Sequence, residues 1–326
     1  MSMKQIIVIT GGSMELKAYI EIMRPANCVM GGLTVPSAVQ IANVFYNLNL
    51  QFFWSNLWIF PHRFIEIALI SYFVYFFIAA AGMVINDIFD LEVDKINKPN
   101  RPLPRGALTV KQAWIYTVIL WTIGITLAFL VSIASGLLAL AFSGVGFLYA
   151  ARVKVLGVLG NFVVAFSFAF GYLYGSLITS LERGIWGIPL MTWLFFITAF
   201  MVLQGREIIK GMEDIEGDKL REVKTIARVY GLRKASIIGA VCNFIGIATF
   251  TLCWVTDTLS PWWVPKLLGF WFIPFYFLGV ASVALSSILI LSKYDSLKAQ
   301  KRSSLLDKIG ALFGLIAFLV GPYTVR

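Results

Sequence analysis

Residues 65–94 read IEIALISYFVYFFIAAAGMVINDIFDLEVD, an apolar run that ends in a cluster of acidic side chains. An α-helix needs about 20 apolar residues to cross a bilayer, so the run predicts a membrane span over 65–87. Carboxylates at the end of such a span are costly and are rarely left without a partner. The stretch therefore predicts a membrane helix that carries a polar site at its end. We call Asn86–Asp94 the first acidic segment.

A second acidic segment, Glu213–Asp218, reads EDIEGD and also follows an apolar run. Asn86, Asp90 and Asp94 are spaced four residues apart, and so are Asp214 and Asp218. Each set projects from one face if its helix continues through the segment. Such oxygen ligands suit Mg²⁺, which also keeps waters and substrate phosphates in its shell. Two ions, one per segment, are expected to bind both phosphates of a substrate diphosphate and to stabilise the negative charge that develops as the diphosphate leaves the substrate. The alternative is that these acids only solvate loops.

The composition is that of an integral membrane protein. Of 326 residues, 59% are hydrophobic and 13% are charged, whereas a soluble domain carries about 25% charged residues. The mean hydropathy is +0.82. Cys28, Cys242 and Cys253 have no Cys-x-x-Cys spacing, which predicts free packing cysteines. His62 is the only histidine, so the chain offers almost no residue for a histidine general base or for a zinc site with histidine ligands.

Apolar runs bounded by charges predict an all-α, polytopic membrane protein. Pro25 and Pro36 interrupt the first span, and a short Ser-Gly turn around Ser135 and Gly136 is expected between the third and the fourth. The nine predicted spans are residues 22–46, 65–87, 110–131, 134–151, 155–179, 186–208, 234–255, 265–291 and 305–322.

Positive charge predicts the orientation of these spans. If the nine spans alternate across the membrane, four of the 27 Lys and Arg fall on one side of it, namely Arg63, Arg183, Lys266 and Arg326, and the others fall on the opposite side. The basic side marks the cytoplasm, and it holds the N-terminus and both acidic segments, with the C-terminus outside. The net charge of +10 therefore sets topology, and no nucleic-acid or protein partner is implied. We expect residues 1–13 to be an N-terminal extension before Met14, and 14–326 to be a single domain.

Basic side chains lie beside both acidic segments and predict phosphate binding. Arginine binds phosphate oxygens bidentately, and lysine acts as a point charge. The alternative is that each charge only sets topology. The candidates are Arg101 and Arg105 after the first segment, Arg206 and Lys210 before the second, and Lys154 after the fourth span.

The pattern Asn86-Asp87-x-x-Asp90-x-x-x-Asp94, with Asn97-Lys98-Pro99-x-Arg101-Pro102-x-Pro104-x-Gly106 after it, closely resembles the first signature of the UbiA superfamily of intramembrane prenyltransferases. Asp214-x-x-x-Asp218 is similar to the second signature. Tyr149-x-x-x-x-Lys154 with Gly160-Asn161 looks like the segment between the fourth and fifth helices of that family. The resemblance runs from about Glu15 to the C-terminus.

This resemblance implies nine transmembrane helices around a central cavity, capped on the cytoplasmic side by the acidic helix-loop segments. It implies a Mg²⁺-dependent transferase with two ions, held by Asn86, Asp90, Asp214 and Asp218. Asp87 and Asp94 would support metal or diphosphate binding, together with Arg101, Arg105, Tyr149, Lys154, Arg206 and Lys210.

The stretch Arg24-Pro25-x-Asn27-Cys28 looks most like the archaeal branch that builds ether lipids. Its members attach a geranylgeranyl chain from geranylgeranyl diphosphate to geranylgeranylglyceryl phosphate, so Arg24 and Asn27 are the expected acceptor-binding residues. Two alternatives remain open, an aromatic acceptor as in quinone, haem or chlorophyll biosynthesis, and a cation transporter. Transport sites usually lie near the bilayer midplane, whereas these acids lie at helix ends.

One position departs from the family pattern. Many members carry a third Asp three residues before the position of Asp214, and this chain has Gly211 there. Fewer anionic ligands weaken metal affinity at oxygen sites. We therefore expect the second ion to bind chiefly together with the diphosphate.

Overall fold

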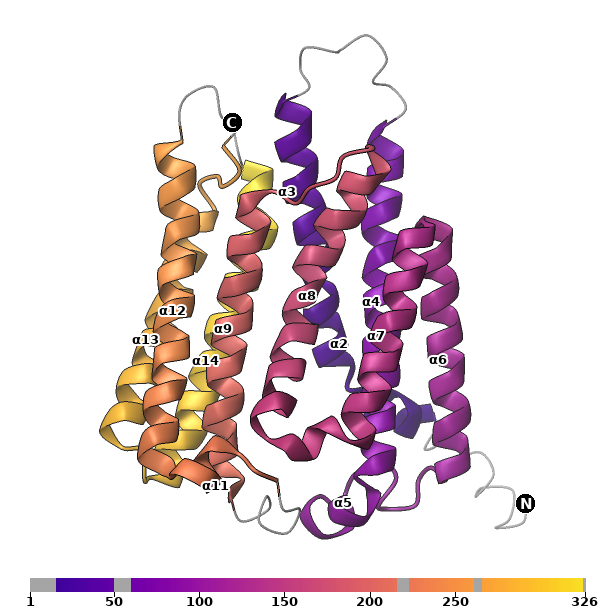
Figure 1. Cartoon of the computed structure of the whole chain (residues 1–326), viewed down its shortest axis with the longest axis vertical. Coiled ribbons are helices and arrows are strands. Elements are labelled where there is room, and N and C mark those ends of the chain that lie inside the picture. The colour runs from indigo at the N-terminus through magenta and orange to yellow at the C-terminus, as the bar shows by residue number, and fades with distance from the viewer. Residues whose placement is uncertain (1–15, 50–59, 216–222, 261–265, 325–326) are drawn as a thin grey trace, which may run out of the picture. The chain divides into compact units, whose positions relative to one another are not determined.

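The computed structural model describes residues 16–49, 60–215, 223–260 and 266–324, and every regular element in these ranges is helical (Figure 1). Nine helices in this part of the chain are long and apolar enough to cross a membrane. The chain packs as two compact units, each described here by itself, Met1–Val29 with Phe73–Arg152 and Met30–Tyr72 with Val153–Arg326. The expected single domain and central cavity stay predictions.

The helices confirm the predicted spans, with differences at their ends. The main helices are α2 (Pro25–Gly32), α3 (Thr34–Asn49), α4 (Phe60–Phe89), α5 (Leu91–Asn97), α6 (Val110–Val131), α7 (Ile133–Ala151), α8 (Val158–Glu182), α9 (Leu190–Glu213), α11 (Ile226–Tyr230), α12 (Leu232–Leu259), α13 (Phe272–Ser292) and α14 (Leu297–Val320). Short 3₁₀ turns cover Val153–Leu156 and Gly321–Thr324.

Two helix starts differ from the prediction for local reasons. Ser296 caps α14 by accepting a hydrogen bond from the Ala299 N–H, so the helix starts earlier than its apolar run. Asp257 holds the backbone N–H groups of Leu267 and Leu268 at 2.6 and 3.2 Å, which keeps 266–271 out of α13. In both cases a polar side chain bonded to backbone N–H groups determines where the helix begins, and an analysis of hydropathy does not detect such contacts.

The predicted Ser-Gly turn around Ser135 and Gly136 is wrong. Ser132 is the turn, because its hydroxyl caps α7 by accepting from the Ser135 N–H at 3.1 Å. Gly136 lies within α7, and a Cβ there would stand 2.3 Å from the Phe129 ring. The glycine therefore allows α6 and α7 to approach closely just beside the turn.

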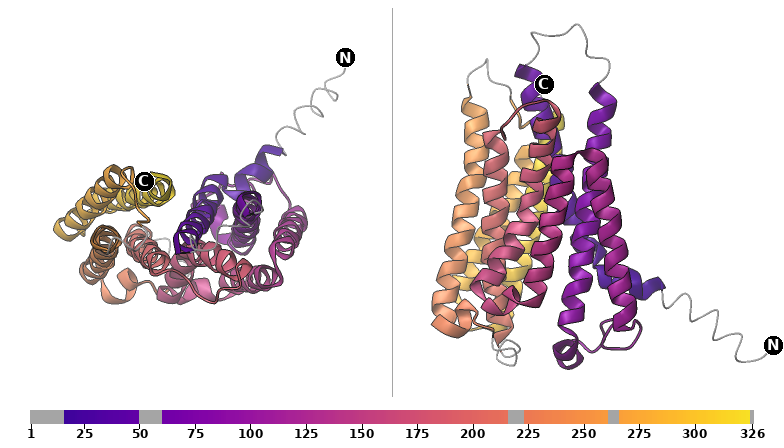
Figure 2. Two further views of the ribbon diagram at one scale, coloured as in Figure 1. Left: turned by 90° about the horizontal axis from the view of Figure 1, so that it is seen from above. Right: turned by 45° about the vertical axis from the view of Figure 1, so that its right-hand side comes forward.

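The first unit contains the helical turns at 16–23, the second half of α4, and α5 to α7 (Figure 2). Its core joins Ala18 and Ile22 to small residues of α4, and Leu103 and Leu108 anchor the loop after α5 in the same cluster. Thr109 and Gln112 form a capping box that starts α6. Together these contacts fix the loop that follows the first acidic segment.

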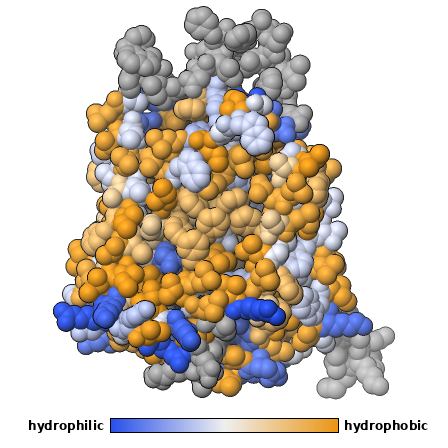
Figure 3. Space-filling model, in the orientation of Figure 1, coloured by the Kyte–Doolittle hydropathy of each residue, from blue (hydrophilic) through white to orange (hydrophobic). Residues whose placement is uncertain are grey.

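The second unit is built from α3, α8, α9 and α11 to α14. Its core is aromatic, with Tyr172, Phe195, Phe250, Phe272 and Phe318 all almost fully buried. Apolar side chains cover the outer flanks of the spans, and strongly hydrophilic residues gather toward their ends (Figure 3). This is the surface expected of a chain surrounded by lipid.

Candidate metal and phosphate site

The first acidic segment continues the helical hydrogen bonding of α4 into α5. The Asp90 N–H bonds to the Asn86 carbonyl at 3.0 Å, and the Asp94 N–H bonds to the Asp90 carbonyl at 2.8 Å. Asp90 itself has helical dihedral angles between the two helices. The spacing prediction is therefore confirmed here, and Asn86, Asp90 and Asp94 lie on successive turns.

Two arginines pair with the buried carboxylates of this segment. Asp87 is 2% exposed and Asp94 is fully buried. Arg101 Nη1 forms a charged hydrogen bond with Asp94 and reaches Asp87 Oδ1 at 3.2 Å. Arg24 Nη2 pairs with the same Asp87 oxygen. Because a buried charge is costly unless it is paired, these arginines allow the segment to be buried.

The backbone at Arg24 explains how its side chain reaches Asp87. Arg24 has φ of +51°, a left-handed conformation that is uncommon for a residue other than glycine. Pro25 follows it, and proline disfavours a right-handed helical conformation in the preceding residue. The helical turns at 16–23 therefore stop at Arg24, and α2 starts at Pro25. Asn27 lies in the first turn of α2 and is exposed.

An oxygen in the first acidic segment is available for a metal ion. Asn86 Oδ1 is buried and has no hydrogen-bond partner, which is costly unless something else binds it. Carboxamide and carboxylate oxygens are the ligands that Mg²⁺ prefers, so the donor set fits this ion. Within the described ranges, no three His, Cys, Asp or Glu side chains form a ready-made metal group.

The second acidic segment begins at the end of α9. Glu213 is the last residue of this helix, and the Asp214 N–H still bonds to the Lys210 carbonyl at 3.1 Å. Asp214 is exposed, whereas Glu213 is partly buried. Asp218 lies outside the described residues, so its predicted pairing with Asp214 stays a prediction.

The helix continues through Gly211, the position that departs from the family pattern. A Cβ added there would meet Thr225 at 3.6 Å, which is ordinary van der Waals contact. Gly211 is therefore not a backbone break, and a Cβ atom fits at this position. Of the two predicted basic residues in α9, Arg206 pairs with Glu207 at 2.7 Å, and Lys210 is half-buried.

Arg105 binds elsewhere in the first unit. Its guanidinium forms two hydrogen bonds with Glu21, at 3.0 and 2.8 Å, and a third with the Asn100 carbonyl at 2.7 Å. The bonded Arg105 guanidinium holds the pKa of the Glu21 carboxyl below its usual value. The structure therefore brings Arg24 and Arg101 to the acids, and it places Arg105 on a separate, exposed ion pair.

Tyr149 and Lys154 fall in different units. Tyr149 is near the end of α7, and Lys154 lies in the 3₁₀ turn that follows. Gly157 comes next, with φ of +60°, and a Cβ there would stand 1.9 Å from the Lys224 carbonyl oxygen. Only glycine allows this turn to pack against the chain that leads into α11.

Sequence reasoning missed a polar cluster inside the second unit. Asp307 of α14 and Asn243 of α12 are both fully buried and share a hydrogen bond of 3.0 Å. A signal was present, because a charged residue inside a membrane span is itself a reason to suspect a function. Asp307 was overlooked because it stands alone, without a cluster around it in the sequence.

Comparison with known proteins places these features in a family. The model of the UbiA prenyltransferase family matches residues 32–323. Digeranylgeranylglyceryl phosphate synthase of Sulfolobus acidocaldarius is 33% identical over 316 residues, which cover 96% of this chain and 100% of the relative.

Two solved structures share the fold. One, of a digeranylgeranylglyceryl phosphate synthase, is 26% identical, with a TM-score of 0.69 and coverage of 94% of this chain and 98% of that one. The other, a UbiA homologue from Archaeoglobus fulgidus bound to GPP and Mg²⁺, has a TM-score of 0.60 at 17% identity. It covers 92% of this chain and 99% of that one. The chain therefore belongs to the UbiA prenyltransferase family.

Proposed function

We propose that this prenyltransferase moves a geranylgeranyl group from geranylgeranyl diphosphate to the free hydroxyl of geranylgeranylglyceryl phosphate. The product is digeranylgeranylglyceryl phosphate, an intermediate of archaeal ether lipids. The observation that carries the proposal is the similarity, along nearly the whole chain, to digeranylgeranylglyceryl phosphate synthases. The paired acidic segment supports it, since it resembles a site built for magnesium and diphosphate.

The chemistry is an exchange of one C–O bond for another. The bond between C1 of the prenyl chain and the diphosphate oxygen breaks, and its electron pair leaves with the diphosphate. The acceptor hydroxyl oxygen forms a new ether bond to C1, and its proton passes to diphosphate or water. Bound Mg²⁺ would neutralise the charge that develops on the leaving group.

We assign the metal ligands to Asn86, Asp90, Asp214 and Asp218, with one ion at each acidic segment. The unpartnered, buried Asn86 Oδ1 supports the first ion, and the exposed Asp214 at the end of α9 supports the second. Asp87 and Asp94 act through the arginines they hold. We assign diphosphate binding to Arg101, Tyr149, Lys154, Arg206 and Lys210, and to Arg105 once its pair with Glu21 opens.

Arg24 and Asn27 are proposed to bind the phosphate of the acceptor. Nη2 of Arg24 bonds to Asp87 and Nη1 contacts the Met83 sulfur at 3.8 Å, which leaves further donors among the five N–H groups of the guanidinium. The side chain is 31% exposed, so the remaining donors are accessible. Asn27, exposed and three residues further on, supplies a neutral donor next to this charge.

The orientation of the chain is also part of the proposal. Both acidic segments and the N-terminus would face the cytoplasm, with the C-terminus outside, because the basic residues concentrate on that side. A reporter fused to the C-terminus should be active only if it functions outside the cytoplasm. Activity of a cytoplasm-dependent reporter at this end contradicts the orientation.

The test is a product assay with purified protein in detergent. Geranylgeranyl diphosphate and Mg²⁺ are incubated with geranylgeranylglyceryl phosphate, with its dephosphorylated analogue, or with 4-hydroxybenzoate, and products are identified by mass spectrometry. We expect Mg²⁺-dependent prenylation of the phosphorylated acceptor. Asp90→Ala should abolish it, whereas Glu92→Ala, a control in the same segment with an 81% exposed side chain, should not. Preferential prenylation of 4-hydroxybenzoate would establish the aromatic alternative instead.

A further inference from the structure

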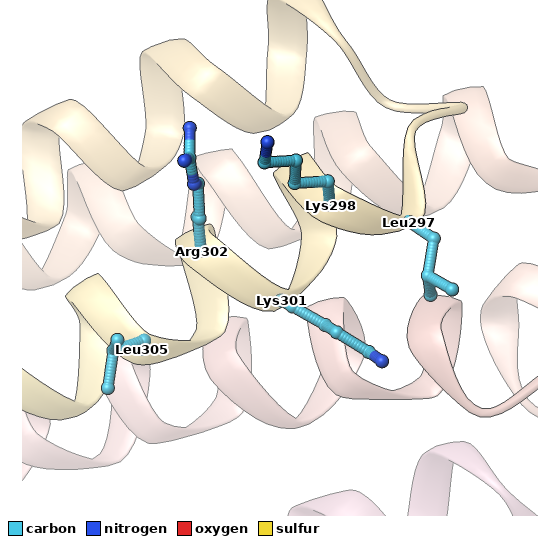
Figure 4. A pocket seen from close by; sticks show the side chains of 5 residues that line it. All are labelled: Leu297, Lys298, Lys301, Arg302 and Leu305. Carbon is cyan, nitrogen blue, oxygen red and sulfur yellow. The ribbon is translucent and has the colours of Figure 1, made fainter.

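The start of α14, in the second unit, carries a shallow pocket of about 510 Å³ on its exposed face. Figure 4 shows that Lys298 and Arg302, one turn apart, extend to the same side of the helix. Leu297, Lys301 and Leu305 are spaced four residues apart and extend toward the other side (Figure 4). All five residues are exposed. The pocket therefore combines three cations with two apolar side chains.

The three cations of this pocket have no ion-pair partner among the described residues. Asp295, two residues before the helix, is exposed and forms no ion pair with them within the described ranges. Like charges three and four residues apart on a helix repel each other. The cations also lie near the N-terminal end of α14, where the helix dipole disfavours positive charge and the first turn holds no acidic residue. An anion bound in the pocket offsets both unfavourable interactions.

The pocket lies at the depth of the lipid headgroups. α14 is one of the candidate membrane spans. Its 24 residues make it about 36 Å long, whereas the hydrocarbon core of a bilayer is about 30 Å thick. Residues 309–320 carry no charge, so this part of the helix belongs in the hydrocarbon core. The basic first turns therefore extend into the headgroup layer.

An apolar surface continues from the pocket toward the hydrocarbon core. Leu305 is 56% exposed and Leu312, two turns further along α14, is 40% exposed. Lys308 lies between them and is exposed, and its long side chain can reach back to the headgroup layer. The exposed face of α14 thus presents positive charge first and apolar side chains after it. A phospholipid has the same order, with its anionic headgroup above its apolar chains.

We propose that this pocket binds an anionic phospholipid of the surrounding bilayer. Lys298 and Arg302 contact the phosphate oxygens, which arginine binds bidentately and lysine binds as a point charge. Lys301 lays its apolar stem along the leucines and extends its ammonium group to the headgroup. Leu305 packs against the first carbons of a lipid chain. The inference goes beyond the proposed function, because it concerns a lipid that is not a substrate and a surface outside both acidic segments.

The test is lipid binding by the full-length protein in detergent micelles, with bound lipid counted by native mass spectrometry. Dioleoylphosphatidylglycerol is the anionic probe, and dioleoylphosphatidylcholine has the same chains with a neutral headgroup. We expect the wild type to bind the anionic lipid about 25-fold more tightly, since each of two basic residues beside an anionic headgroup contributes about fivefold. Added salt should reduce this preference. Equal affinity for the two lipids would overturn the proposal.

The decisive variant combines Lys298→Gln with Arg302→Gln. Both positions are exposed and glutamine favours a helix, so the fold should be retained, which the thermal midpoint without lipid checks. The preference for the anionic lipid should disappear. If the double variant does not fold, Arg302→Gln alone should reduce the preference about fivefold. An unchanged preference in the folded variant would overturn the proposal.

The matched control combines Arg233→Gln with Lys234→Gln. It removes the same charge from exposed positions at the start of α12, in the same unit, and neither residue lines the pocket. This variant should keep the wild-type preference for the anionic lipid. A loss as large as that of the pocket variant would show attraction to net charge without a site, and would overturn the proposal.

A last arm distinguishes a lipid from a soluble anion. Equimolar inorganic diphosphate should not displace dioleoylphosphatidylglycerol from the wild type, because it has no apolar chain. Leu305→Gln should weaken binding of this lipid about threefold, because it removes apolar contact with the chain. Displacement by equimolar diphosphate, or wild-type affinity in Leu305→Gln, would show that the pocket takes a soluble anion and would overturn the assignment to a lipid.

Discussion

The two acidic segments differ in how their carboxylates are placed in the structure. In the first, Asp87 and Asp94 are buried, and each is already bonded to an arginine. In the second, Asp214 is exposed at the end of α9, and the aspartate expected at position 211 is a glycine. The carboxylates of the first segment are therefore already paired in this structure, and we propose that the second segment is completed by its ligand.

Burial explains why the arginines belong to the first segment. A carboxylate removed from water must be paired, or it shifts toward its neutral form and destabilises the fold. Arg24 and Arg101 thus have a folding role in addition to any part in catalysis. Asp214 carries no such requirement, since water already solvates it. Variants in the two segments should therefore fail in different ways.

The largest effect is expected on turnover when a proposed metal ligand is removed. Asp90→Ala and Asp214→Ala should each lower the rate by about 10³-fold, since charge stabilisation in the transition state is lost. Asp214→Ala should keep the wild-type thermal midpoint, because this side chain is exposed. The rate of product formation and the thermal midpoint are measured on the same preparation. Full turnover in either variant would rule out a metal at that segment.

The next largest effect concerns stability in the first segment. Arg101→Gln should cost about 3 kcal/mol of folding free energy, because it removes the cation that is bonded to the buried Asp94 carboxylate. The matched control is Lys95→Gln, which breaks an exposed pair with Glu92 of 2.7 Å and should cost less than about 0.5 kcal/mol. Thermal unfolding in detergent compares the two. Equal midpoints for both variants would show that the buried pair does not stabilise the fold.

A smaller effect is expected when the second segment is given its missing carboxylate. Gly211→Asp should lower the Mg²⁺ concentration for half-maximal rate by about fivefold, because an added anionic ligand raises metal affinity. A Cβ atom at this position lies 3.6 Å from Thr225, which is an ordinary van der Waals contact. Gly211→Asn, with the same shape and no charge, is the control. An unchanged Mg²⁺ requirement in Gly211→Asp would place this position outside the metal shell.

The smallest effect is a pH dependence at the exposed pair of Glu21 and Arg105. The pKa of Glu21 is lower in the folded protein than its unfolded value of 4.5. The ion pair therefore stabilises the fold fully above pH 4.5, and this stabilisation is lost as the pH falls through the folded pKa. The pair is exposed, so the contribution is about 0.5 kcal/mol. Wild type should exceed Glu21→Gln in thermal midpoint at pH 7, and the two should converge near pH 3. A constant difference across this range contradicts the prediction.

The sequence predicted the membrane spans well, because each depends on a long apolar run that needs no tertiary information. The spacing of four residues also indicated that Asn86, Asp90 and Asp94 share one face if the helix continues, and the structure meets this condition. The residues that pair with this segment were harder to predict. Arg24 and Asp87 are 63 residues apart, and their pairing depends on a backbone turn at Arg24 that only the folded chain shows.

Other errors have similar causes. The start of α14 was misplaced because Ser296 caps a polar turn before the apolar run begins. Arg105 stays a proposed diphosphate-binding residue, but the sequence did not show that its guanidinium is bonded to Glu21, 84 residues earlier. Asp307 was missed because its hydrogen-bond partner, Asn243, lies on α12 and is 64 residues away in the sequence. In each case the deciding contact joins distant parts of the chain or involves a single polar atom.

Magnesium binding measured by calorimetry tests the contrast between the two segments most directly. The full-length protein is titrated with Mg²⁺ in the absence and in the presence of an unreactive prenyl diphosphate analogue. We expect one ion without the analogue, held by the organised first segment, and two ions with it, the second completed by diphosphate oxygens. Two ions bound with equal affinity without the analogue, or only one ion in its presence, would contradict this account.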